Sequence, residues 1–195
     1  MNFRSNIDSK EIHQLPLYLY DGEVVVIDTI EKYNKVKHEL FLEKIWGFDT
    51  ESKPTFKKGI AYRHPVALLQ LSGSNKTFLF RLNKLPIQQE LLEFFTSPQY
   101  IKIGLAIRDD LKFLKRLQSF EPAGFIDLQS IVKSYNINEL GLRKLAALVL
   151  NVRISKSQQL SNWDADILTD KQIKYAATDS WISREIYLKL IKSKI

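Results

Sequence analysis

The sequence predicts a mixed α/β domain in which helices cover a sheet with both parallel and antiparallel strand pairs. Short apolar runs of strand length, such as "EVVVID" at residues 23–28, dominate its first half. Segments with a helical period alternate with them and take over towards the C-terminus, a pattern typical of a layered α/β domain. A chain of 195 residues suits one ordinary domain. We therefore expect a single domain over 1–195, with residues 1–17 as a loosely held N-terminal leader.

The elements follow in order from hydrophobic periodicity and from helix-capping signals. Strands are expected at 23–28, 45–51, 66–73, 77–82, 101–106 and 125–129. Helices are expected at 29–44, 86–97, 107–118, 130–136, 142–151 and 169–193. Thr29 and Thr169 can act as N-caps, because a threonine hydroxyl can accept a hydrogen bond from a free N–H of the first helical turn. The basic segment 52–65, which Pro and Gly interrupt, is expected to be a loop.

The composition narrows the class of partner. Lys and Arg number 29 against 22 Asp and Glu, which gives a net charge of +7. Such a balance favours polyanions, and we expect nucleic acid rather than a membrane because nothing resembles an amphipathic anchor. A basic surface without a specific partner is the alternative. There is no cysteine, which excludes disulfides and thiolate metal sites. The N-terminus lacks an apolar signal core, so a cytoplasmic protein is expected.

Acidic residues occupy unusual positions in three of the predicted elements. Asp49 and Glu51 are two apart at the end of a hydrophobic strand, so they point to the same face. Like charges on one face repel unless a cation lies between them. Two acids at a solvated strand end would be the simpler explanation of this pair alone.

Two helices repeat this oddity. In "IRDDLKFLKRL", Asp110 lies on the apolar stripe, whereas Asp109 lies on the opposite side with Lys112 and Arg116. In "YAATDSW", Asp179 shares the buried stripe of the last helix with Tyr175, one turn earlier. A helix-dipole contact could explain Asp110, and a buried Tyr–Asp hydrogen bond could explain Asp179. One explanation covers all three elements: the four carboxylates converge on Mg²⁺ or Mn²⁺, and a pair of such ions is suited to phosphodiester displacement.

The same residues carry a resemblance to a known family. "GFDTE", "IGLAIRDDLKFL" and "YAATD" resemble, in this order, the three motifs of the DEDD 3′→5′ exonucleases, in the tyrosine form of the ribonuclease D / Werner-type branch. The segment "SNWDADILTDKQIKYAATDSW" is also similar to the family's approach to the third motif. The similarity runs from about residue 23 to the C-terminus. It implies a ribonuclease H-like fold with a mixed five- or six-stranded sheet flanked by helices.

The resemblance also implies roles for the acidic residues and for a tyrosine. Asp49, Glu51, Asp110 and Asp179 would hold two ions, Mg²⁺ or Mn²⁺, and Tyr175 would orient the attacking water. The substrate would be the 3′ end of single-stranded or frayed DNA or RNA, released as nucleoside 5′-monophosphates. Larger members append a helical nucleic-acid-binding domain, and we expect the catalytic domain alone here because the chain ends at Ile195.

Substrate contacts are expected from basic residues beside these acids. The loop after Glu51 supplies the candidates Lys53, Lys57, Lys58, Arg63 and His64. Contact with backbone phosphates is the functional reading and a solvated loop is the alternative. Arg153 and Lys156, before the third motif, are weaker candidates. Trp163 and the pair Phe94 and Phe95 are expected in the core.

Two other functions remain open at this stage. One is a nucleic-acid-binding module that keeps the fold without cutting. The other is an endonuclease. DNA or RNA preference and the oligomeric state are not determined by the sequence.

Overall fold

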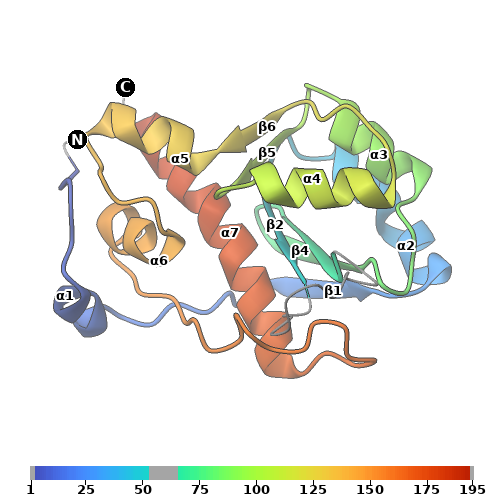
Figure 1. Cartoon of the computed structure of the whole chain (residues 1–195), viewed down its shortest axis with the longest axis horizontal. Helices are drawn as coiled ribbons and strands as arrows, with labels where there is room; N and C mark the ends of the chain where they lie inside the picture. The colour runs from blue at the N-terminus through green and yellow to red at the C-terminus, as the bar shows by residue number, and fades with distance from the viewer. Residues whose placement is uncertain (1–2, 53–65, 194–195) are drawn as a thin grey trace, which may run out of the picture.

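A six-stranded mixed sheet organises the chain, and helices cover both of its faces (Figure 1). The computed structural model describes residues 3–52 and 66–193. The strands are β1 (Glu23–Ile27), β2 (Ile45–Glu51), β3 (Leu68–Ser72), β4 (Lys76–Arg81), β5 (Ile101–Gly104) and β6 (Phe125–Asp127). Their order is β1-β4-β3-β2-β5-β6. Strand β3 runs antiparallel to β2 and β4, and the other pairs are parallel. The predicted mixed α/β class is confirmed.

The helices divide into two layers. They are α1 (Ser9–Gln14), α2 (Ile30–Val36), α3 (Gln89–Thr96), α4 (Arg108–Leu117), α5 (Leu128–Ile131), α6 (Leu142–Leu145) and α7 (Asp170–Lys192). Helices α2, α3 and α4 share one apolar cluster with one face of the sheet. The long helix α7 crosses the other face and contacts β2, β3, β4 and β5 (Figure 1). The end of the central strand β2 therefore lies between two helical layers.

Three predicted helices have different bounds in the structure. The helix expected over 29–44 ends at Val36 and continues as a 3₁₀ turn, Lys37–Phe41, which buries Leu40. The helix expected over 130–136 begins at Leu128, because the Asp127 side chain caps it, and it then tightens into a 3₁₀ turn, Val132–Tyr135. The helix expected over 142–151 becomes a π-helix at Ala146–Leu150. The N-cap roles of Thr29 and Thr169 are confirmed by the hydrogen bonds that their side chains accept.

The N-terminal segment is held in place along its described part, so the expectation of a loose leader over residues 1–17 is wrong for residues 3–17. Helix α1 begins with a capping box at Asp8 and buries Ile12, which is 1% exposed. The Pro16 carbonyl accepts a backbone hydrogen bond from Arg153 at 3.0 Å. Apolar contacts under α1 and pairing with a distant loop outweigh the polar composition that suggested a free leader.

None of the helices in the described ranges combines the length and the apolar composition that a bilayer crossing requires.

Candidate active site

Three carboxylates meet where the end of β2 faces α7. Asp49, Glu51 and Asp179 each offer an oxygen, and these oxygens all lie within 4.8 Å of one another. We call these three residues the acidic centre. Asp49 and Glu51 share a face of β2, as the strand period predicts. Asp179 is 7% exposed in the middle of α7, as its helical stripe predicts.

A glycine and a serine allow α7 to lie close enough to β2 for this meeting. A Cβ atom at Gly47 would lie 1.8 Å from the Ser180 carbonyl oxygen, so only glycine fits there. The Ser180 hydroxyl contacts the Ser72 hydroxyl at 2.6 Å, which joins α7 to β3 through a buried hydrogen bond. Ser180 is therefore in close contact with the sheet, and this contact brings the adjacent Asp179 to the end of β2.

Asp110 lies on the other side of β2. The Thr50 hydroxyl donates a hydrogen bond to its Oδ1 atom, and Thr50 points to the face opposite Asp49 and Glu51. Asp110 is half-buried in the first turn of α4, whereas Asp109 is exposed and pairs with Arg108 at 4.0 Å. The predicted inward phase of Asp110 is confirmed. Asp110 Oδ1 is occupied by the Thr50 hydroxyl, while its charge acts on Asp49 and Glu51. The predicted convergence of four carboxylates therefore stays a prediction for Asp110.

A carboxylate that the sequence reading did not single out fixes the start of α4. Asp127, at the end of β6, accepts hydrogen bonds from the backbone N–H groups of Ala106 at 2.9 Å and Ile107 at 3.2 Å. Ala106 has a φ of 56°, a left-handed conformation that costs a non-glycine residue about 1 kcal/mol or more. The two hydrogen bonds offset this cost and fix the start of α4. They thereby position Asp110, which lies in the first turn of that helix.

The carboxyl groups of Asp49, Glu51, Asp110 and Asp179 have raised pKa values. Burial, followed by the charges of Asp179 and Asp110, raises the pKa of Asp49 well above its usual range. Burial and the neighbouring carboxylates raise the pKa of Glu51 to about 10. Burial also raises the pKa of Asp110, which the Thr50 hydrogen bond opposes. The pKa of Asp179 rises to about 7 through burial, against a hydrogen bond from Tyr175 and the positive charge of Lys156.

Tyr175 joins the acidic centre from one turn before Asp179. Its side chain is 8% exposed and its ring packs against Trp163 at 6.0 Å between ring centroids. Burial and the adjacent carboxylates raise the pKa of its hydroxyl, so the phenol stays protonated at neutral pH. Tyr175 can therefore donate a hydrogen bond here.

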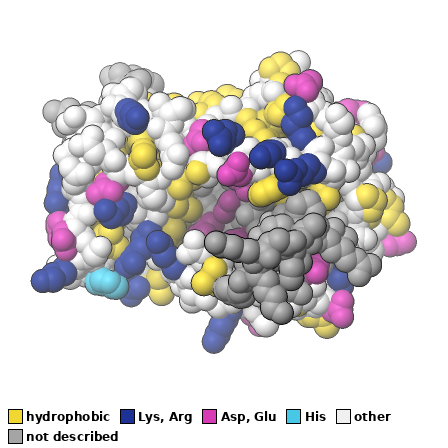
Figure 2. Space-filling view, viewed as in Figure 1, with side chains coloured by type: hydrophobic (Ala, Val, Ile, Leu, Met, Phe, Trp, Pro, Cys, Tyr) yellow, Lys and Arg dark blue, Asp and Glu magenta, His cyan; other side chains and the backbone are white. Residues whose placement is uncertain are grey.

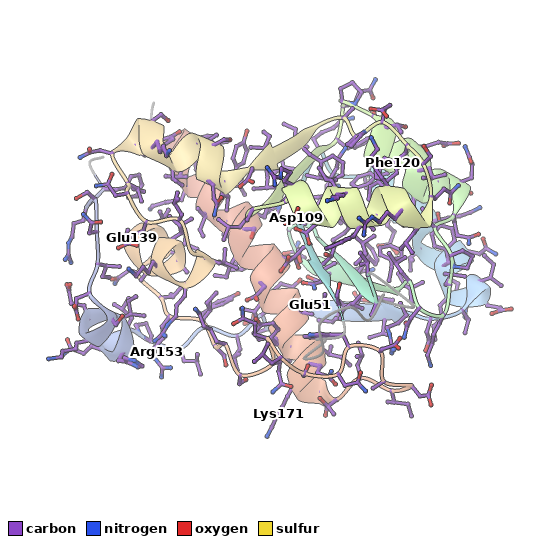
Figure 3. The ribbon with its side chains drawn as sticks, viewed as in Figure 1. Glu51, Asp109, Phe120, Glu139, Arg153 and Lys171 are labelled. Carbon is purple, nitrogen blue, oxygen red and sulfur yellow. The ribbon has the colours of Figure 1, made fainter. Side chains whose placement is uncertain are left out.

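The acidic centre forms part of a cleft of about 700 Å³. Residues of α1, α6, α7, the end of β2 and the loop 152–159 line it. Glu51 and Glu139, which both line the cleft, lie on opposite sides of α7 in Figure 3, so the cleft extends across that helix. On this face of the molecule, acidic side chains appear near the middle, with groups of Lys and Arg side chains to both sides (Figure 2).

The basic residues predicted to bind substrate differ in where the structure places them. Lys53, Lys57, Lys58, Arg63 and His64 lie outside the described residues. Lys156 is exposed and lines the cleft. Arg153 does not line it, and its Nε atom donates to the Leu15 carbonyl at 2.9 Å, which holds the N-terminal segment.

The side chains that were assigned to the core behave as predicted. Trp163, Phe94 and Phe95 are each 0% exposed. Two cleft cations, Arg143 and Lys144, were missed, and no sequence signal distinguished them from the other basic residues. Gln70, which faces Asp49 across the β2–β3 ladder, was also missed. Neither polar atom of its buried side chain has a hydrogen-bond partner in the described part of the chain.

The donors of the acidic centre fit a divalent cation. Within residues 3–52 and 66–193, the buried Oδ1 atom of Asp179 has no hydrogen-bond partner, a costly state that a bound cation would relieve. Carboxylate oxygens are the ligands that Mg²⁺ and Mn²⁺ prefer. Three closely spaced carboxylates whose pKa values are raised by burial and mutual repulsion would become ionised on binding such an ion.

The fold and the acidic centre define a ribonuclease H-like α/β domain with a candidate metal site at the end of its central strand. Solved structures agree on the fold. The Nibbler EXO domain of Aedes aegypti superposes with a TM-score of 0.78 at 24% identity, over 87% of this chain and 88% of that one. The ribonuclease D of Trypanosoma brucei, solved in complex with RNA, gives 0.77 at 20% identity, over 88% of this chain and 63% of that one.

The chain belongs to the 3′-5′ exonuclease family, whose model matches residues 24–194. It is 34% identical over 163 residues to the "Exonuclease 3′-5′ domain-containing protein 2" of Drosophila melanogaster, a match that covers 82% of this chain and 27% of the fly protein. The ribonuclease D of Gluconacetobacter diazotrophicus is 28% identical, over 86% of this chain and 42% of that protein. The chain thus spans less than half the length of these two relatives. The predicted family resemblance is confirmed.

Proposed function

We propose that the chain is a metal-dependent exonuclease that hydrolyses phosphodiester bonds at the 3′ end of DNA or RNA and releases nucleoside 5′-monophosphates. The observation that carries this proposal is the acidic centre in the cleft of a chain that belongs to this family. Its substrate would be a single-stranded or frayed 3′ end. The RNA complex of the trypanosomal ribonuclease D supports nucleic acid as the ligand class.

Asp49, Glu51 and Asp179 would hold Mg²⁺ or Mn²⁺, and Asp110 would complete the ligand set for a second ion by leaving Thr50. Bound divalent cations supply Lewis-acid chemistry, which makes a water a better nucleophile and stabilises charge on the leaving oxygen. The protein's own contribution is to keep these carboxylates close together in a partly buried cleft. Their mutual repulsion makes cation binding favourable.

Tyr175 would position the attacking water. Its raised pKa keeps the hydroxyl protonated, so it acts through a hydrogen bond of fixed direction rather than by removing a proton. The ring is fixed by Trp163 and the hydroxyl is held near Asp179, which limits where a water can lie. Orientation of this kind raises the rate of the chemical step without changing substrate affinity.

The test uses a 5′-labelled oligonucleotide with either a free or a blocked 3′ end. With Mn²⁺ or Mg²⁺ we expect stepwise shortening and mononucleotide products from the free end alone, and none in EDTA. The Asp49→Asn variant, purified in parallel, controls for a contaminating nuclease. Internal cuts in the blocked strand would indicate an endonuclease instead. Binding without cleavage under every metal condition would indicate a non-catalytic binding module.

A further inference from the structure

Arg143 is an unpaired cation on the wall of the cleft, at the start of α6. Among the described residues, its buried Nε atom has no hydrogen-bond partner. In the same part of the chain, its guanidinium makes one hydrogen bond, between Nη2 and Nε2 of His13 at 3.4 Å. No carboxylate lies within ion-pair distance of it among residues 3–52 and 66–193. Leaving a charged donor desolvated and unpaired is costly, so this position favours an anionic ligand.

The neighbouring lysine shows the contrast. Lys144 also lines the cleft, but Glu139 neutralises it at 2.9 Å. Lys156 lines the cleft as well, and its charge reaches Asp179, which places Lys156 near the acidic centre. Two cations without a carboxylate partner in the described part of the chain, Lys156 and Arg143, thus share one cleft with the acidic centre.

We propose that Arg143 forms a phosphate subsite for the nucleic-acid strand upstream of the 3′ end, in the cleft that it shares with Lys156 and the acidic centre. This inference rests on the proposed function, because the strand direction follows from cleavage at the 3′ end. A guanidinium suits this role since its planar fork can donate two hydrogen bonds to one phosphate.

Helix α1 positions this subsite. His13 lies in the last turn of α1 and meets the Arg143 guanidinium, while Ile12 of the same helix lines the cleft. The match to the family model begins at residue 24, so α1 precedes the matched region. The subsite is therefore built partly from a segment outside the matched region. His13 acts as a positioning residue, through Arg143.

The test separates strand binding from chemistry. Binding of a labelled 12-nucleotide single strand is measured by fluorescence anisotropy in EDTA at several salt concentrations. Hydrolysis of the p-nitrophenyl ester of thymidine 5′-monophosphate with Mn²⁺ reports the acidic centre alone, since this substrate has no upstream phosphate. Lys133→Gln, which removes one exposed charge outside the cleft, is the matched control.

We expect Arg143→Gln to weaken strand binding about 10-fold to 100-fold, as the loss of a charge-assisted hydrogen bond implies. The slope of log affinity against log salt should fall by about 0.7, the value for one phosphate contact in a single strand. Hydrolysis of the small ester should not change. Arg143→Lys should restore the salt slope but only part of the affinity. His13→Ala, at an exposed position, should lower affinity with the slope retained.

Several outcomes would overturn the subsite. One is an unchanged salt slope in Arg143→Gln, and another is a slope change matched by Lys133→Gln. Equal losses for the strand and the small ester would show that Arg143 supports the acidic centre or the fold instead. If Arg143→Gln does not fold, Arg143→Lys decides the matter, because full affinity in that variant contradicts a forked phosphate contact. Failure of the wild type to hydrolyse either substrate would refute the proposed function, while the binding measurement would still judge the subsite.

Discussion

Two places in this molecule bury charge, and they resolve it differently. Lys102 on β5 is 0% exposed, and its Nζ atom donates to the carbonyls of Phe94 at 2.9 Å and Ser97 at 3.0 Å. The same atom lies over the rings of Phe94 and Phe125, at 5.1 and 4.8 Å from their centroids. These carbonyls belong to the C-terminal end of α3, where the helix dipole favours a cation. The fold thus supplies partners for this charge.

Among the described residues, the acidic centre is compensated only in part: Tyr175 and Lys156 act on Asp179, while its Oδ1 atom has no hydrogen-bond partner. The neighbouring carboxylates raise the pKa values of Asp49 and Glu51 on top of the effect of burial. Lys102 is fully buried and the acidic centre is partly buried, so burial alone does not separate structure from function. The two sites differ in whether the folded chain provides enough hydrogen-bond or charged partners for the buried group. Lys102 is satisfied and serves the fold, whereas the acidic centre calls for a ligand from outside the chain.

The largest expected effect comes from replacing, one at a time, the two adjacent aspartates in the first turn of α4. Asp110→Asn should abolish nucleotide release, because it removes a carboxylate from the proposed ligand set, while the metal-free fold should be as stable or more stable. Asp109→Asn, an exposed change one residue away, should keep substantial activity. Time courses on a labelled oligonucleotide, with thermal melting in EDTA, measure both effects. If Asp109→Asn is the inactive variant, Thr50 and Asp110 serve only the packing of α4.

Removal of the Tyr175 hydroxyl should have the next largest effect. Tyr175→Phe keeps the ring beside Trp163 and leaves every carboxylate in place. Single-turnover cleavage should slow by about 10²-fold, the loss expected when a reacting group is misplaced. Mn²⁺ affinity should barely change, whereas Asp179→Asn should weaken it together with the rate. Equal loss of Mn²⁺ in the two variants would assign the hydroxyl a structural role, and a normal rate would assign it to core packing.

The acidic centre should make the metal-free protein less stable as pH rises. Its carboxyls have folded pKa values above their unfolded values of about 4, so the fold favours their protonated forms. Their stabilising contribution is complete below about pH 4 and is lost as pH rises through the folded pKa, which is about 7 for Asp179. Denaturant unfolding in EDTA at pH 5 and pH 8 should show this decrease. Asp49→Asn should flatten it, and Mn²⁺ should reverse it at pH 8. If the stability of the wild type depends on pH as weakly as that of Asp49→Asn, the acidic centre does not destabilise the metal-free fold.

The smallest expected effect concerns Lys102, and its sign is opposite. Burial lowers the pKa of Lys102 to about 7, below the unfolded value of about 10.4, because its two carbonyl partners offset only part of the lost hydration. Stability from this group therefore rises with pH between these values and is lost as pH falls towards 7. Lys102→Met loses two hydrogen bonds at every pH but removes this dependence. The melting temperature of Lys102→Met minus that of the wild type, both measured in EDTA, should be larger at pH 6.5 than at pH 9.5. A constant difference would show that Lys102 is not titrating in the fold.

Much of the fold was predictable because local signals agree with the final structure. The strand expected at 45–51 is β2, residue for residue, since an apolar run with Gly47 at its centre fits a buried strand. The helix expected over 169–193 is α7 with Thr169 as its cap. The helix at 142–151 was less predictable, because its change to a π-helix and its end at the left-handed Asn151 depend on packing rather than on propensity.

Periodicity alone placed Asp49, Glu51, Asp110, Asp179 and Tyr175 on inward faces, because side-chain direction repeats every 2 residues in a strand and every 3.6 in a helix. It could not show which element covers each face. Only the tertiary structure put Asp110 on Thr50, in the helical layer opposite Asp179. Only packing brought α1 against α6 and left Arg143 unpaired in the cleft. The sequence thus determined the direction of each functional side chain. The contacts between distant segments decided its neighbours, since those contacts depend on how whole elements pack rather than on local pattern.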